Sequence, residues 1–159
     1  MNVLNHMKES FSALGLPVLK EHKEGRFPCL ESEVRYGEYV MHILALHDPD
    51  EGMVVVSITF SLAAPPENRK TVIELVNLIN HYLDTGHYTV CPRTGKIILK
   101  FGLFVVNGSL NKEQFLRFLQ KLLGDGHLFY PLICEQVYSE KTPEAMITRF
   151  LNANRHLWK

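Results

Sequence analysis

Residues 70–107 constrain the fold of this chain more than any other stretch. Within residues 71–83 the apolar side chains recur at steps of three and four, the spacing of one face of an amphipathic helix. We expect this helix to end at Gly86, because glycine readily takes the left-handed backbone of a C-terminal cap. Strands over residues 87–91 and 96–106 follow, so the helix leads directly into a hairpin.

Three more antiparallel strands are expected before that helix, over residues 27–35, 39–47 and 53–60. Pro28 has no backbone N–H to donate, so we place the start of the first of these strands at a sheet edge. Residues 20–25 are polar, and we interpret them as a link between elements. The pattern therefore predicts an α+β fold with an antiparallel sheet of five strands.

Helices are expected around these strands in the order α-β-β-β-α-β-β-α-α. Residues 3–14 carry an apolar stripe that is too short to be stable alone, so this helix must dock on the rest of the chain. The central helix opens at Pro65 and Pro66, or it starts later with Thr71 and Glu74 as a capping box.

The last two helices are predicted from their caps. Ser109 or Asn111 caps the first of them, and Gly124 and Gly126 are expected to break it. Thr142 caps the final helix. Between the two lies an apolar segment whose conformation, helical or irregular, the pattern leaves open.

The strands over residues 39–47 and 96–106 carry apolar side chains on both faces. One layer of helices covers only one face of a sheet, so the other face needs a second layer of helices or a second subunit. We favour a second subunit, because a contiguous apolar patch in water promotes association. The residues that we assign to the core or to a dimer or partner interface, without apportioning them, are Val54, Val56, Ile58, Leu99, Phe101 and Leu103.

The composition predicts a single domain over residues 1–159, since 46% of the side chains are hydrophobic and can form a core. Acidic and basic residues number 17 each, so the chain lacks the positive field of a nucleic-acid-binding protein. Lys100 interrupts the longest apolar run, and no membrane span is expected. Lys8 and Glu9 interrupt the apolar run that a signal peptide would need, which favours the cytoplasm.

No residue pattern predicts an enzyme, a cofactor or a metal site. Cys29, Cys91 and Cys134 lie far apart and form no CxxC pair, so we interpret them as reduced thiols, while the spacing leaves one disulfide open. Gly95 and Lys96 resemble the end of a phosphate loop, but a strand follows them instead of a helix, and we predict a hairpin turn. The eight histidines show no ligand spacing and are interpreted as surface residues.

The order of the elements, together with several short motifs, resembles the YbjN-like family of bacterial sensory transduction regulators. In the first half of the chain the similarity lies in element order alone. In the second half it is carried by Leu-Val-Asn-Leu-Ile-Asn at 75–80, Gly-His-Tyr at 86–88, Gly-Lys at 95–96, Leu-Lys-Phe at 99–101, Leu-Asn-Lys-Glu-Gln-Phe at 110–115, Tyr-Pro-Leu-Ile at 130–133 and Thr-Pro-Glu-Ala at 142–145.

This resemblance implies the type III secretion chaperone-like fold, a homodimer or higher oligomer, and binding of other proteins without catalysis. No catalytic residues come with it. Our first hypothesis is therefore an oligomeric, chaperone-like or regulatory module that recognises partner segments through apolar surface. The alternative is a small-ligand sensor with a pocket between sheet and helices. An enzyme ranks last, because no cluster of titratable groups is evident.

Overall fold

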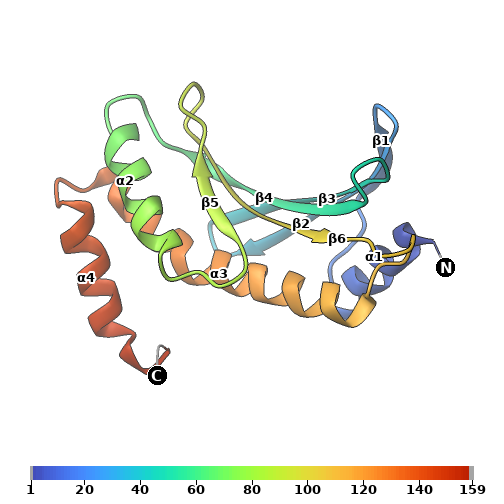
Figure 1. Ribbon diagram of the computed structural model, residues 1–159. Helices are drawn as coiled ribbons and strands as arrows, with labels where there is room; N and C mark the ends of the chain where they lie inside the picture. Colours follow the sequence, from blue (N-terminus) through green and yellow to red (C-terminus); the bar gives the residue numbers. More distant parts are fainter. Residues whose placement is uncertain (1, 158–159) are drawn as a thin grey trace.

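A six-stranded antiparallel sheet extends through the computed structural model, which describes residues 2–157. The strands lie in the order β1-β2-β3-β4-β6-β5, so that β1 and β5 are the two edges (Figure 1). Consecutive hairpins join the first four strands, and β6 returns beside β4. The strand bounds are Lys20–Glu24 (β1), Phe27–Tyr36 (β2), Tyr39–Asp48 (β3), Met53–Ala63 (β4), His87–Val90 (β5) and Lys96–Phe104 (β6).

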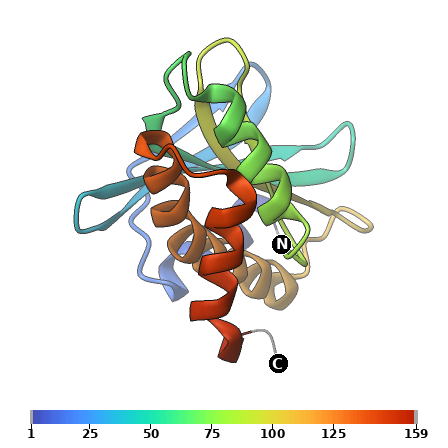
Figure 2. The ribbon, with the colours of Figure 1, turned by 90° about the vertical axis from the view of Figure 1, so that its left-hand side faces the viewer.

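The helices of the described chain lie below the sheet or beside one of its ends, and none lies over its other face (Figure 1). The helix α1 contacts β2 and β3, whereas α3 contacts β4 and β6. The helix α2 packs on β5 and α3, and α4 packs outside α2 and α3 (Figure 2). Their bounds are Val3–Ala13 (α1), Arg69–Asn80 (α2), Lys112–Tyr138 (α3) and Pro143–Ala153 (α4), followed by a short 3-10 turn at Arg155–Leu157.

The core lies between the helices and the face of the sheet that they cover. All six residues assigned to core or interface belong to this covered face, and each is between 0% and 8% exposed: Val54, Val56, Ile58, Leu99, Phe101 and Leu103. Cross-strand pairing aligns them, because Val54 pairs with Leu103 and Ile58 with Leu99. They are therefore core residues of this chain. Their chain neighbours point to the opposite, uncovered face.

The sheet has one strand more than the five predicted, because residues 20–24 form β1 instead of a polar link. Lys20 pairs with Glu31 and Glu24 with Phe27, so β1 covers the side of β2 that was expected to be free. The prediction that β2 starts at a sheet edge was therefore wrong. Pro28 is accommodated because it pairs with β1 just before the ladder between β2 and β3 begins at Cys29.

The central helix starts between the two predicted starts and ends earlier than predicted. It starts at Arg69, after a turn containing the two prolines, and the Thr71 hydroxyl donates a hydrogen bond to the Asn68 carbonyl (2.8 Å) instead of closing a capping box. It ends at Asn80, well before Gly86. Gly86 has another role: a Cβ atom there would lie 2.6 Å from Leu122 Cδ1 and 3.2 Å from the Lys100 carbonyl oxygen, so glycine favours the close approach of this segment to α3 and β6.

The helix α3 is continuous for 27 residues, through both glycines that were expected to break it and through Pro131. Tertiary packing explains the outcome at Gly126, where a Cβ atom would lie 3.0 Å from Met41 Sδ. The missing side chain lets the helix rest closely on the sheet, and this contact outweighs the low helix propensity of glycine. The predicted caps at Asn111 and Thr142 are confirmed, since each side-chain oxygen accepts a backbone N–H bond.

Candidate partner-binding surfaces

The uncovered face of the sheet carries an apolar patch toward the end of β3 and the start of β4. We call it the open-face patch, and it consists of Leu44, Leu46, Met53, Val55 and Phe104. The register joins these residues directly, because Leu46 pairs with Val55 and Met53 with Phe104. Phe104 is 69% exposed and the other four are partly buried. Exposed aromatic and aliphatic side chains grouped in this way are typical of protein-binding surfaces.

Met53 shapes the floor of the patch. Gly102 pairs with Val55 on the neighbouring strand, and a Cβ atom at Gly102 would lie 2.8 Å from Met53 Cε. The methionine side chain therefore covers bare backbone at this point. Because methionine is unbranched and has three rotatable bonds, it fills such gaps adaptably.

Charged side chains of opposite sign flank the patch. Glu31, Leu44, Ser57 and Lys100 form one row across β2, β3, β4 and β6, so that Glu31 and Lys100 lie on opposite sides of the apolar residue. His22 Nε2 lies 3.3 Å from Glu31 Oε1. Lys20 on β1 pairs with Glu31 in the same row, so the acidic residue on the β2 side has basic neighbours, whereas the β6 side carries Lys100.

Both edges of the sheet are protected against an added strand. The β1 edge has the sequence Lys-Glu-His-Lys-Glu, and charged edge strands disfavour pairing with another chain. At the β5 edge, the Asn80 side-chain amide donates to the Tyr88 carbonyl (2.9 Å) and accepts from the Tyr88 N–H (2.7 Å). The side chain thus occupies the position of a neighbouring strand. Recognition by addition of a strand at the β5 edge would have to displace this contact.

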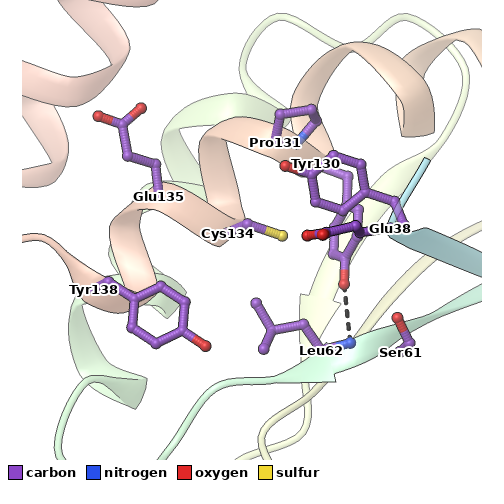
Figure 3. A pocket seen from close by; sticks show the side chains of 9 residues that line it. Glu38, Ser61, Leu62, Tyr130, Pro131, Cys134, Glu135 and Tyr138 are labelled. Carbon is purple, nitrogen blue, oxygen red and sulfur yellow. Dashed lines mark hydrogen bonds between the residues drawn. The ribbon is translucent and has the colours of Figure 1, made fainter. Parts of the chain in front are cut away.

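A pocket of about 670 Å³ lies at the other end of the sheet, where β3 begins and β4 ends (Figure 3). The second half of α3 forms its opposite wall. The residues that line it are Glu38, Tyr39, Ser61, Leu62, Tyr130, Pro131, Cys134, Glu135 and Tyr138. They come from three separate stretches of the chain, and sequence analysis did not identify them as a group.

Tyr130 anchors the base of this pocket. The pairing of β4 with β6 shifts register between Thr59 and Ala63. Within this irregular stretch, the Leu62 N–H donates a hydrogen bond to the Tyr130 hydroxyl oxygen (2.9 Å). Burial raises the pKa of Tyr130 to about 12 and that of Cys134 to about 11. Both groups are therefore neutral at physiological pH.

The hairpin turn after β5 contains a thiol of different character. The predicted hairpin turn is confirmed. Two hydrogen bonds of 2.8 Å close it, one from the Cys91 N–H to the Lys96 carbonyl and one from the Gly95 N–H to the Cys91 carbonyl. The Thr94 side chain and the backbone N–H groups of the turn lower the pKa of Cys91 to about 7. Nothing in the turn supplies a general base, so the thiol has the acidity of a reactive cysteine without catalytic partners.

Metal-ligand clusters and membrane-length helices were both sought among residues 2–157. No three histidine, cysteine, aspartate or glutamate side chains in this range gather in a way that could hold a metal ion. His42 lies instead on the open face, with Nδ1 at 3.2 Å from Glu33 Oε2. No helix in the same range is long and apolar enough to cross a bilayer.

The fold and these surfaces define the class of protein: an α+β chain with the type III secretion chaperone-like fold, whose antiparallel sheet is covered by helices on one side. The family model YbjN, described as "Putative bacterial sensory transduction regulator", matches residues 5–135. The chain therefore belongs to the YbjN family. A search of curated proteins found no match.

Three solved structures share the fold at low sequence identity. The protein YbjN from E. coli is 14% identical, with a TM-score of 0.53, over 77% of this chain and 84% of that one. The ExsC–ExsE complex contains a chain that is 15% identical, with a TM-score of 0.55, over 84% and 97%. A Methanothermobacter thermautotrophicus protein of uncharacterised function is 14% identical, with a TM-score of 0.57, over 84% and 97%.

Proposed function

We propose that this chain is a non-enzymatic regulatory module that binds other polypeptide chains in the bacterial cytoplasm. The observation that carries the proposal is the open face, on which the open-face patch presents apolar side chains to solvent. Membership of a family described as sensory transduction regulators supports a regulatory role. A chain with the same fold occurs in the ExsC–ExsE complex, and this supports partner binding as the mode of action.

The occupant that we propose for the open-face patch is a second copy of this chain. In a two-fold face-to-face pair, the patch of one copy lies on the patch of the other. When the two-fold axis runs parallel to the strands, it brings Glu31 of one copy toward Lys100 of the second, because the two residues lie on opposite sides of the patch. Charge complementarity of this kind sets register and orientation. The pocket at the other end of the sheet stays accessible to a further partner.

Size-exclusion chromatography with light scattering over a concentration series tests the dimer. The wild type is expected at twice the chain mass of 18.3 kDa. Val55→Lys places an unpaired charge in the interface, which costs about 3 kcal/mol and weakens the dimer by roughly a hundredfold. Val18→Lys is the matched control, since Val18 is exposed and lies outside the strands. A wild type that stays monomeric at the highest concentration contradicts the proposal.

The second candidate function is a small-ligand sensor, and the pocket of about 670 Å³ favours it. Pockets of this size accept drug-sized ligands, and its lining mixes apolar side chains with a few polar groups. A thermal-shift screen against metabolites separates the two functions, because a ligand that binds only the folded state raises its midpoint. A ligand whose effect is lost when the pocket is altered would favour the sensor.

A further inference from the structure

The pocket between α3 and the end of the sheet differs chemically from the open-face patch. Its lining includes three tyrosines and two glutamates, but neither lysine nor arginine. We infer that it accepts the guanidinium group of an arginine side chain presented by a partner polypeptide. The inference rests on the proposed role as a partner-binding module and names a second site for it.

The two glutamates have different environments. Glu135 Oε2 accepts a hydrogen bond from Arg149 (2.6 Å), and its carboxylate points away from Tyr130 and Cys134 (Figure 3). Glu38 points into the pocket, toward Cys134, and forms no ion pair with the residues described at positions 2–157 (Figure 3). The pocket therefore presents one carboxylate that forms no ion pair within residues 2–157.

The remaining polar groups of the pocket do not compete with Glu38 for charge. The Tyr130 hydroxyl accepts the Leu62 N–H, and its own proton is retained because burial raises the pKa of the phenol to about 12. The Cys134 thiol is neutral for the same reason. The Glu38 carboxylate is the acidic group that faces this pocket, and the complementary ligand is a cation.

The aromatic lining selects the kind of cation. Tyr39 packs edge-on against Tyr130, with ring centroids 5.3 Å apart, and Tyr138 is 79% exposed at the mouth. A planar guanidinium stacks on tyrosine rings and also forms paired hydrogen bonds with a carboxylate, which an ammonium group does less well. A tyrosine left this exposed next to a pocket is typical of an interface anchor.

The shape of the pocket favours a side chain over a free molecule. Small-molecule sites usually enclose about 70–90% of the ligand surface. Here Glu38 and Tyr138 are both exposed, so one side of the pocket is open to solvent. An arginine attached to a polypeptide that crosses this opening can reach Glu38 and still continue along the surface.

An NMR titration of the full chain with matched probes tests the inference. N-acetyl-arginine amide is expected to shift the backbone amides of Glu38, Leu62 and Tyr138 at saturable concentrations. N-acetyl-citrulline amide has the same length and shape without the charge, and it is expected to bind at least fivefold more weakly, by about the worth of one exposed charge pair. Equal binding of the two probes overturns the inference. Binding of n-butylguanidine about tenfold tighter than the arginine amide (~1.4 kcal/mol) assigns the pocket to a free cation and also overturns it.

Variants identify the residues that carry the binding. Glu38→Gln is expected to weaken the arginine probe about fivefold, and Tyr138→Leu about threefold through loss of the ring face. Glu51→Gln is the matched control, because Glu51 is an exposed glutamate in the turn at the opposite end of β3. Unchanged affinity in Glu38→Gln overturns the inference. If the chain is a dimer but does not bind the probe, only the inference about the pocket is contradicted. If the chain is a monomer and binds the probe, only the proposed dimer is contradicted.

Discussion

The two faces of the sheet are built from the same strands but have different roles. On β6, Leu99 is completely buried under the helices, while its neighbour Ile98 lies on the open face and is partly exposed. The covered face is apolar along the whole length of β4, whereas Ser57 and Thr59 interrupt the open face. This difference shows that a strand with apolar residues on both faces does not have to lie between two hydrophobic cores. One side forms the core, and the other is exposed to solvent.

The largest expected effect is a difference in the free energy of unfolding between substitutions on the covered face and on the open face. Leu99→Ala removes buried methyl groups from the core and is expected to lower the free energy of unfolding by about 3 kcal/mol. Ile98→Ala removes a similar volume from the open face and should cost about 1 kcal/mol. Urea unfolding at concentrations where the chain is monomeric measures both. Equal losses would show that the open face is as important to the monomer as the core.

A second, intermediate effect concerns the edge that adjoins the covered face. Asn80→Ala removes both hydrogen bonds to Tyr88 and leaves a backbone N–H and C=O unpaired, which is expected to cost about 2 kcal/mol. It should also promote association at high concentration, because the β5 edge becomes available. Asn77→Ala on the exposed side of the same helix is the control. If the two variants are equally stable and equally monodisperse, Asn80 does not protect the edge.

The smallest expected effect is a difference in reactivity between the thiol in the β5–β6 turn and the two buried thiols. Measuring it leaves the fold unchanged. Cys91 has a pKa of about 7, so roughly half of it is thiolate at neutral pH, whereas burial raises the pKa of Cys29 and Cys134. Iodoacetamide is therefore expected to modify Cys91 first, at a rate that rises as pH increases through about 7. Mass spectrometry after short exposure identifies the site.

Thr94→Ala checks the cause of this reactivity. The Thr94 side chain makes the largest contribution to the lowered pKa of Cys91, so its removal should raise that pKa and slow alkylation at neutral pH. Denatured protein, in which all three thiols react, provides the reference. Faster labelling of Cys134 than of Cys91 in the folded chain would contradict this account.

Much of the fold was predictable because several local signals agree with it. The strand alternation over residues 39–60 and the caps at Asn111 and Thr142 are all confirmed. The elements that were mispredicted depend on tertiary contacts. The strand β1 has no apolar residue, so its pattern carries no strand signal, and it forms because β2 offers a paired edge. The continuity of α3 at Gly126 depends on the close contact with Met41.

The candidate sites were less accessible to sequence analysis. Val54 and Leu99 were assigned to core or interface without a choice between them, although Ser57, Thr59 and Lys100 on the alternate face indicate which side is exposed. The pocket has no local signal at all. It brings together a hairpin turn, the end of β4 and the second half of α3, and only the folded chain places these segments side by side.

The absence of a side chain at Gly102 makes the shape of the open face depend on the conformation of Met53. Since Met53 covers it without a branched or rigid side chain, a rotation about the methionine torsions uncovers bare backbone while the strands stay in register. The surface can thus offer a raised or a hollow contour at the same point. A contact region with this freedom can accommodate neighbours of unequal shape, and a Met53→Ile substitution would leave it with only one contour.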